Sequence, residues 1–439
     1  MRSRGALLAI MTVGMAAVHA GSTPVSIHVQ AGATGQTAAA PAQDDPVRTL
    51  VGRLDLERYK ATIKGLTQFG DRRQGTDRNR AANDWVEAQL KSYGCSSVER
   101  LTYEYAPAAR SAAGTGRGGQ AAAAGGRAAG GAGTGAAAGA GGGQAASAQG
   151  RGRGGATAIK GHRGPTGVNN DAEKQPDPAL RVLNMQPTTP GPRDEVYCTK
   201  IGSTRPNEMY IVSGHMDGIA YGAGANDNAS GAALVMELAR IFSAPDVQTD
   251  RSIRFVLWNN EETGLNGARA YAAERGPLQG KEDPPGSGRY PEPTWLGVIA
   301  HDMMLFDHGM PGADGKLSPE QRAEADVNIE FAGTSKMAAQ AQELAWVFKN
   351  ANDRYATDYP AVVGNRMSNT DSAAFQDLVA SISLREAERQ SQIGAGWDPH
   401  WHQPTDVFAT FSDKDFRLGL NAAQTTLAAI AQLVGAKVK

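Results

Sequence analysis

The sequence predicts a three-layer α/β/α domain whose central sheet is mixed and mainly parallel. The first indication is a strand–helix–strand unit, in which the apolar runs 210–214 and 253–258 enclose a helical pattern over 235–242. Such a unit places its two strands in parallel. The second indication is the alternating segment 98–105, which is typical of a strand and which we expect to form a hairpin with the next strand candidate.

The remaining elements follow in chain order. Residues 48–93 show helical spacing with a polar break at 70–76, and the strand that pairs with 98–105 is expected at 180–186. The later elements are a strand at 296–300, a helix at 338–348 and a strand at 380–384. The loop 276–293 contains five prolines, and we interpret it as a surface insertion near the rim of the substrate pocket.

Both composition and the first residues limit the class of protein. The 44 Lys and Arg nearly balance the 45 Asp and Glu, which excludes attraction to nucleic acid or to an anionic membrane as an organising principle. Residues 1–20 resemble a signal peptide, with a basic start and an apolar run too short to span a membrane. We therefore expect export to the periplasm or the extracellular space. There Cys95 and Cys198 could form a disulfide, but the sequence leaves their pairing open.

Two segments of biased composition divide the chain. Residues 21–46 are interpreted as a low-complexity linker, so the folded domain is expected to span 47–439. Residues 107–170 interrupt this domain with 21 Gly, 20 Ala, seven basic residues and no acidic one. The segment has too little apolar surface to offset the conformational entropy that it would lose on ordering. We therefore expect this insertion to be disordered. Without the insertion and the signal peptide, 35 basic residues face 45 acidic ones.

Polar side chains follow the buried strands at the points where these strands end. His215 and Asp217 come after the first of the two parallel strands, and a glycine-rich loop then leads to Asp227. Glu261 and Glu262 follow the second strand, Asp302 follows the third, and His402 lies in a late loop. Ligands of open α/β sheets bind at the carboxyl ends of the strands. Imidazole nitrogen and carboxylate oxygen are the ligands of catalytic zinc, so the sequence predicts a zinc site at this edge.

The order of these motifs resembles that of the secreted bacterial zinc aminopeptidases, a peptidase family that also contains glutamate carboxypeptidase-like enzymes and glutaminyl cyclases. The shared pattern is His-x-Asp at 215–217, Asp-Asn-x-Ser-Gly at 227–231, Glu-Glu-x-Gly at 261–264, a strand-end Asp and a late His before Pro-x-Asp. The resemblance implies an eight-stranded sheet, two zinc ions per chain, and hydrolysis of N-terminal residues from peptide substrates.

The resemblance also implies a role for each residue of the site. Asp227 would bridge the two zinc ions, with His215 and Asp302 on one ion and Glu262 and His402 on the other. The remaining residues are assigned by chemistry: Glu261 is free to act as general base, and Asp217 is expected to orient the imidazole of His215. Trp401 stands where several relatives carry Tyr, so it either donates to the oxyanion or lines the pocket. Asp371 lies in a Thr-Asp-x-x-x-Phe segment and is a further candidate for substrate binding.

Three other functions stay open at this stage. A two-zinc carboxypeptidase or dipeptidase would need a cation for the substrate carboxylate, and Arg366 or Arg385 could supply it. A glutaminyl cyclase uses one zinc ion, which the intact motif at Asp227 argues against. A catalytically silent binding domain would be expected to have lost a ligand or Glu261. Neither the side-chain preference nor the oligomeric state follows from the sequence.

Overall fold

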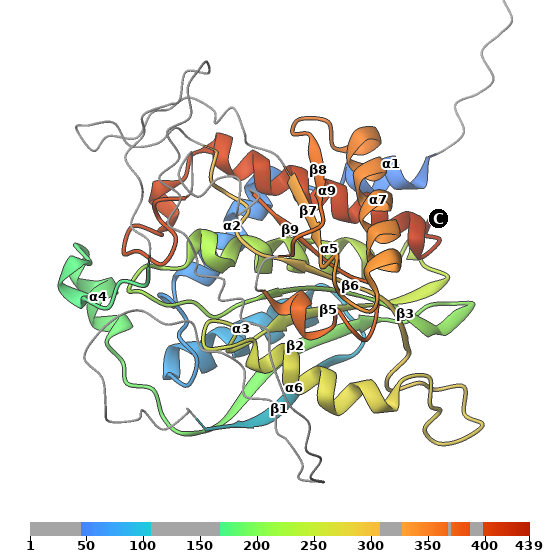
Figure 1. The fold of residues 1–439 in the computed structure, drawn as a ribbon, viewed down its shortest axis with the longest axis horizontal. Coiled ribbons are helices and arrows are strands. Elements are labelled where there is room, and N and C mark those ends of the chain that lie inside the picture. The colour runs from blue at the N-terminus through green and yellow to red at the C-terminus, as the bar shows by residue number, and fades with distance from the viewer. Residues whose placement is uncertain (1–44, 107–166, 308–326, 368–369, 387–397) are drawn as a thin grey trace, which may run out of the picture. The chain divides into compact units, whose positions relative to one another are not determined.

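An eight-stranded sheet forms the centre of the part of the chain that the structure describes, with the strand order β1-β2-β5-β3-β6-β9-β7-β8 (Figure 1). A computed structural model describes residues 45–106, 167–307, 327–367, 370–386 and 398–439. The strands of the sheet are β1 (Val98–Tyr105), β2 (Gly191–Lys200), β3 (Arg205–His215), β5 (Arg251–Trp258), β6 (Thr294–His301), β7 (Val327–Phe331), β8 (Ala361–Gly364) and β9 (Ser381–Arg385). The short strands β4 (Val247–Gln248) and β10 (Lys437–Val438) pair separately.

The pairing pattern confirms the predicted mixed and mainly parallel sheet. The four central strands β5, β3, β6 and β9 are each parallel to the next. Antiparallel pairs flank them, because β2 runs antiparallel to β5 and to β1 on one side and β7 runs antiparallel to β9 on the other. The carboxyl ends of the four central strands therefore meet at one edge of the sheet.

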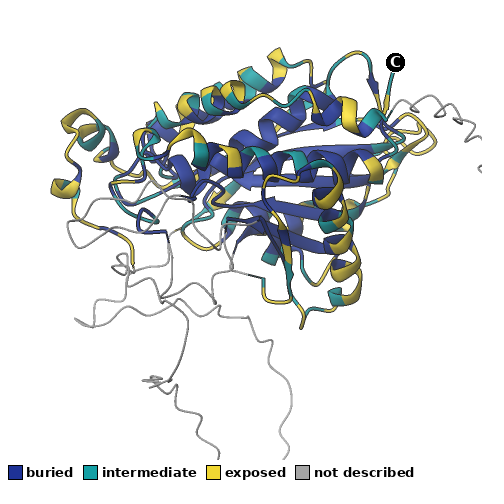
Figure 2. Cartoon of the chain, turned by 90° about the horizontal axis from the view of Figure 1, so that it is seen from above, coloured by how far each residue is buried: buried dark blue, intermediate teal, exposed yellow. Residues whose placement is uncertain are grey.

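Two hydrophobic clusters, one on each face of the sheet, make up the core. Successive side chains of a strand point to opposite faces, so Tyr210 and Val212 of β3 join the larger cluster while Met209 and Ile211 join the smaller one. In Figure 2 the strands are buried between these layers. The larger cluster is covered by α1 (Pro46–Val51), α2 (Leu56–Thr67), α3 (Asp77–Ser92), α5 (Gly231–Phe242), α7 (Ala338–Tyr355) and α9 (Asp413–Leu433), and the smaller one by α6 (Asn266–Arg275) and the 3-10 turn η4 (Asp371–Ala374).

The prediction of a strand at 180–186 is wrong, because residues 180–184 form the end of helix α4 (Pro178–Asn184). The Asp177 side chain accepts hydrogen bonds from the backbone N–H groups of Ala179 and Leu180, and Pro178 takes the first helical position. This Asp-Pro pair is a helix-start signal that outweighs the apolar residues behind it. The strand that pairs with β1 is instead β2, so the predicted hairpin exists with a longer connection.

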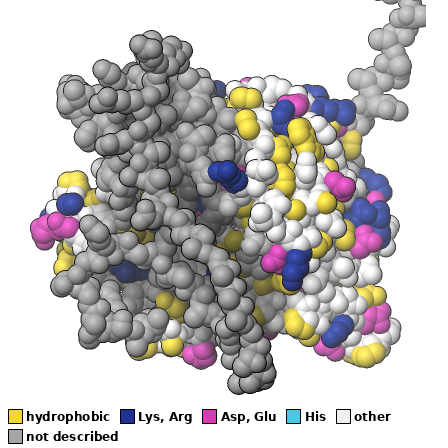
Figure 3. All heavy atoms as spheres, viewed as in Figure 1, with side chains coloured by type: hydrophobic (Ala, Val, Ile, Leu, Met, Phe, Trp, Pro, Cys, Tyr) yellow, Lys and Arg dark blue, Asp and Glu magenta, His cyan; other side chains and the backbone are white. Residues whose placement is uncertain are grey.

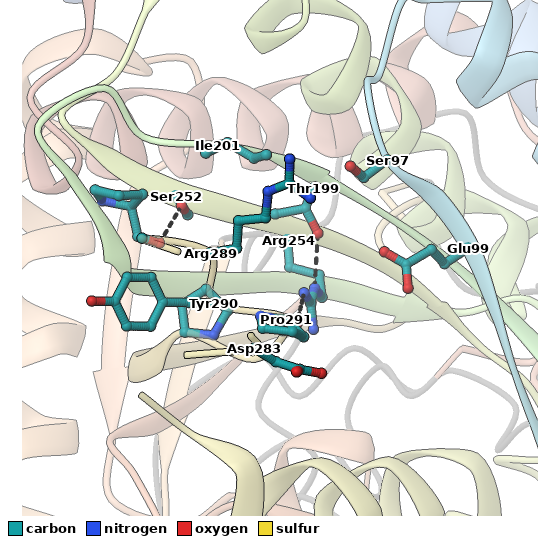
Figure 4. A pocket seen from close by; sticks show the side chains of 13 residues that line it. Ser97, Glu99, Thr199, Ile201, Ser252, Arg254, Asp283, Arg289, Tyr290 and Pro291 are labelled. Atoms are coloured by element: carbon teal, nitrogen blue, oxygen red, sulfur yellow. Dashed lines mark hydrogen bonds between the residues drawn. The ribbon is translucent and has the colours of Figure 1, made fainter. Parts of the chain in front are cut away.

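The proline-rich loop 276–293 lies at the opposite edge of the sheet from the one expected. The loop precedes β6, so it meets the sheet where the parallel strands begin rather than where they end. There it lines a pocket of about 350 Å³ with Arg289, Tyr290 and Pro291, next to Ser252 at the start of β5 (Figure 4). The loop therefore does not border the edge that carries the predicted zinc ligands.

Some of the predicted segments fall outside the described residues. These are the signal peptide 1–20, nearly all of the linker 21–46, and the insertion 107–170 up to residue 166. Within the described ranges, no helix has both the length and the apolar character that crossing a bilayer requires. Figure 3 shows basic and acidic side chains interspersed over the described surface of one face.

The pairing that the sequence left open is present, because Cys95 and Cys198 form a disulfide with a Cα–Cα distance of 6.1 Å. Cys95 precedes β1 and Cys198 lies in β2, so the bond ties the edge hairpin together at the end far from its connection. The closed loop spans 103 residues and includes the whole insertion.

Replacing both cysteines by alanine should lower the free energy of unfolding by about 2–4 kcal/mol, because the unfolded chain then regains the freedom of that long loop. Urea unfolding without a reducing agent measures the change. The wild-type protein, unfolded in the presence of a reducing agent, should show a loss of similar size. A double variant as stable as the oxidised wild type would contradict this account.

Candidate active site

The residues predicted from strand ends gather at the carboxyl edge of the central sheet. Buried β3 ends at His215, β5 leads into the turn that carries Glu261 and Glu262, and β6 is followed by Asp302. Asp227 comes from the segment between β3 and α5. His402 is brought in from the loop before α9, almost 190 residues after His215 in the chain.

Asp227 stands between two pairs of potential metal ligands. Its Oδ1 atom lies 3.4 Å from Nε2 of His215, and the same nitrogen lies 3.4 Å from Oδ1 of Asp302. Its Oδ2 atom lies 3.0 Å from Nε2 of His402, which is 2.9 Å from Oε2 of Glu262. In each of these two groups of three, the ligand atoms lie within 4.8 Å of one another.

Glu261 belongs to a third group of this kind, with His215 and Glu262. Its backbone N–H donates a 3.0 Å hydrogen bond to Oδ1 of Asp217, so the carboxylate of Asp217 fixes the turn that presents Glu261. The imidazole of His215 is held differently from our expectation. Its Nδ1 atom lies 3.0 Å from the backbone oxygen of Asp217, whereas Oδ1 of that residue is 3.8 Å away. An N–H at Nδ1 leaves Nε2 as the lone-pair nitrogen that faces the carboxylates.

Asp406 has a role that the sequence analysis missed. This buried carboxylate accepts hydrogen bonds from the backbone N–H groups of Asn226 at 2.7 Å and of Asp227 at 3.0 Å. It therefore anchors the backbone of the residue that both ligand pairs share. The sequence did mark this residue, because Asp406 is the acid of the Pro-x-Asp motif that follows His402. The sequence could not show which backbone groups it binds, since those groups lie far away in the chain.

Arg72 is a second missed residue, and it holds the glycine-rich loop in place. Its fully buried guanidinium donates to the backbone oxygens of Met216 at 2.6 Å, Ala223 at 2.6 Å and Gly224 at 2.8 Å. The three carbonyls lie on both sides of the loop between His215 and Asp227, so one side chain fixes both ends of it. Nothing in the sequence marks Arg72, which lies in the polar break of the helical region.

The carboxyl groups of the site strongly affect one another because they are buried. Burial raises the pKa of Glu262 to about 7, although His402 opposes the shift, and it raises the pKa of Glu261 well above the usual value for a glutamate. Burial also raises the pKa of Asp371 to about 8. For His215, burial lowers the pKa, but the neighbouring carboxylates, Glu261 first among them, outweigh burial and raise it well above its ordinary value.

The imidazole and carboxylate groups of the site, and the buried carboxylate oxygens that have no partner among the described residues, fit a metal centre. The Oε1 atom of Glu262 and both carboxylate oxygens of Asp371 are buried and have no hydrogen-bond partner within the described residues. Unpaired buried carboxylates are unfavourable unless cations accompany them. Two imidazoles and three carboxylates, arranged as two groups that share Asp227, are ligands that zinc takes in catalytic sites.

The expected substrate-binding residues lie in different surroundings. The indole ring of Trp401 stacks on the imidazole of His402, with ring centroids 4.2 Å apart and planes 25° apart. Asp371 opens the turn η4 and is buried, and its charge contributes to the raised pKa of Glu261. Arg385 is also buried, and its guanidinium donates to Oδ2 of Asp302 at 2.5 Å. Arg366 lies on the surface.

Known proteins share this sequence pattern and this fold. The family model described as "Peptidase family M28" matches residues 196–426. The "Probable lipoprotein aminopeptidase LpqL" of Mycobacterium tuberculosis is 33% identical over 280 residues, which are 60% of this chain and 48% of that protein. The chain thus spans about half the length of this curated relative, and less of several others.

Solved structures at low identity share the fold. A zinc aminopeptidase from Bacillus subtilis, BSAP, superposes with a TM-score of 0.52 at 13% identity, covering 87% of this chain and 95% of that one. The glutaminyl cyclase of Porphyromonas gingivalis gives a TM-score of 0.50 at 14% identity, covering 87% and 99%. Since the family model spans more than half of its residues, the chain belongs to Peptidase family M28, as the motif order predicted.

Proposed function

We propose that this protein is an exported two-zinc aminopeptidase that removes N-terminal residues from peptides. The observation that carries the proposal is the position of Asp227, whose Oδ1 faces His215 and whose Oδ2 faces His402. A carboxylate that offers one oxygen to each of two ligand pairs suits a bridge between two ions. The proposed ligands are therefore His215, Asp302, Asp227, Glu262 and His402.

Export is supported by two independent features. The first 20 residues have the composition of a signal peptide. The disulfide between Cys95 and Cys198 is of a kind that persists in oxidising compartments such as the periplasm or the extracellular space.

Glu261 is the proposed general base. Two zinc ions, when bound, would polarise the scissile carbonyl and lower the pKa of a water molecule towards neutrality. Glu261 takes the proton of the attacking water and returns it to the leaving amine. Its position supports this role, because a carboxylate oxygen of Glu261 lies within 4.8 Å of ligand atoms of His215 and Glu262. Asp217 holds the turn through the backbone N–H of Glu261.

Charge favours a substrate with a free amine over one with a free carboxylate. Asp371 offers two buried oxygens without a partner among the described residues, so we assign to it the α-ammonium group of the peptide. A carboxypeptidase would instead need a free cation, and one of the two candidates, Arg385, is buried and bound to Asp302. Trp401 is assigned to the wall of the substrate-binding site, because its ring covers one face of the imidazole of His402.

One assay separates this function from its alternatives. A leucine anilide with a free amine should be cleaved, its N-acetyl derivative should not, and a zinc chelator should abolish the cleavage. Hydrolysis of an N-blocked dipeptide with a free carboxylate would indicate a carboxypeptidase. Cyclisation of an N-terminal glutamine would indicate a glutaminyl cyclase, and no turnover with any of these substrates would support a binding domain.

Glu261→Gln should lower kcat by about 10²–10⁴-fold, since a general base is lost while the shape of the side chain is kept. The zinc content should stay at the wild-type value. Glu274→Gln, on the exposed surface of α6, is the matched control and should keep full activity. A Glu261→Gln variant that loses zinc would make Glu261 a ligand, and one that retains near-full turnover would exclude it as the base.

Asp227→Ala should reduce the zinc content more than His402→Ala does. The first change removes the shared carboxylate and leaves two cations poorly screened from each other, whereas the second removes one ligand of one ion. Metal analysis after dialysis should give about two zinc per wild-type chain, a partial deficit for His402→Ala and the largest deficit for Asp227→Ala. One zinc per wild-type chain, with equal deficits in both variants, would favour a one-zinc centre.

A further inference from the structure

Arg385 lies behind one of the proposed ligands, at the end of a neighbouring strand. β6 and β9 are parallel, with His301 opposite Leu384, so the next residues along the two strands are Asp302 and Arg385. The backbone N–H of Asp302 continues this pairing with a 3.2 Å hydrogen bond to the oxygen of Leu384. This register places the guanidinium of Arg385 2.5 Å from Oδ2 of Asp302.

The two carboxylate oxygens of Asp302 therefore contact different groups. Oδ2 is turned to Arg385, while Oδ1 lies 3.4 Å from Nε2 of His215. A charge-assisted hydrogen bond from a guanidinium is short and directional, so it holds this carboxylate oxygen in place. Both side chains are almost fully buried, at 2% exposure for Arg385 and 6% for Asp302, so water does not compete for this contact.

A third buried group offsets the charge of the guanidinium. Glu330 of β7 lies 3.8 Å from Nε of Arg385 through its Oε2 atom, and its side chain is 1% exposed. Register explains this contact, because Asn328 pairs with Arg385 in the antiparallel ladder and Glu330 is the diagonal neighbour on the same face. With Glu330 behind it, Arg385 adds little net charge to the site, so its main effect on Asp302 is orientation.

In the described ranges, no comparable cation supports the other half of the centre. Glu262 directs Oε2 towards His402, and its Oε1 atom has no hydrogen-bond partner in the described part of the chain. We propose that Arg385 is a positioning residue that holds Asp302 for cation binding with His215, and that it acts on this half of the centre alone. The inference depends on the proposed ligand set, but it can fail while that ligand set stands.

The test measures zinc affinity in two single-site backgrounds. His402→Ala retains the His215 half, and His215→Ala retains the His402 half. Equilibrium dialysis of the metal-free proteins against zinc gives a dissociation constant for each half. Adding Arg385→Gln should weaken binding about 10–100-fold in the His402→Ala background and leave it nearly unchanged in the His215→Ala background. Arg385→Lys should weaken binding in the same half by a smaller factor, because the charge is kept while the fixed direction of the guanidinium N–H donor is lost.

The outcomes distinguish three effects of Arg385: orientation of Asp302, repulsion of the zinc ion by its charge, and destabilisation of the fold when a buried arginine is replaced. If Arg385 acted by repulsion, Arg385→Gln would tighten zinc binding, and this result would overturn the proposal. Arg254→Gln is the matched control, because Arg254 is equally buried and paired with Glu292, near the start of the parallel strands. An equal loss of affinity in Arg254→Gln would overturn the proposal. Unchanged zinc affinity in both Arg385 variants would also overturn the proposal. If Arg385→Gln does not fold, Arg385→Lys alone still tests it.

Two results separate this inference from the proposed centre. Absence of zinc binding in the wild-type protein would overturn both. Zinc binding in both backgrounds without any dependence on Arg385 would overturn the role of Arg385 and leave the ligand set intact.

Discussion

The central constraint on this structure is a surplus of buried negative charge at one edge of the sheet. Among the described residues, the side chains of Asp217, Asp227, Glu262, Asp302 and Asp371 are shielded from water and lie around the imidazoles of His215 and His402. Burial raises the pKa values of such carboxyl groups, as for Glu262 and Asp371, so these groups bind either protons or cations. The fold must therefore hold like charges close together, and much of the surrounding architecture serves that end.

Buried side chains from other parts of the chain supply this restraint, and two of them bond directly to the backbone around Asp227. The carbonyls around the loop 216–224 converge on Arg72, and the amides of 226 and 227 converge on Asp406. Both contacts fix main-chain positions, so the side chain of Asp227 starts from a determined point. Arg385 gives Asp302 a comparable anchor from the adjacent strand. Since each anchor comes from a distant part of the sequence, the site depends on the packing of the whole sheet.

Sequence reasoning identified the residues at strand ends and failed for those that act through tertiary contacts. Periodicity and apolar runs located β3, β5 and β6, and parallel strands must end at one edge, so the gathering of His215, Glu262 and Asp302 followed. Arg72 gave no signal, because the carbonyls through which it acts on the site come from a loop more than 140 residues away. The error over the loop 276–293 was avoidable: a segment that precedes a parallel strand lies at the edge opposite to the site.

The described residues on either side of the segment 107–166 both contact the turns and loops that carry the site. The hydroxyl of Tyr105 donates to the hydroxyl of Thr263 at 3.2 Å, and the backbone N–H of Asn169 donates to the oxygen of His402 at 3.0 Å. The paired strands β1 and β2 and their disulfide already fix the hairpin from the other end. The turn that carries Glu262 and the loop that carries His402 are therefore each held by a residue close to one end of the segment 107–166, so the site is fixed by the described chain on both sides of it.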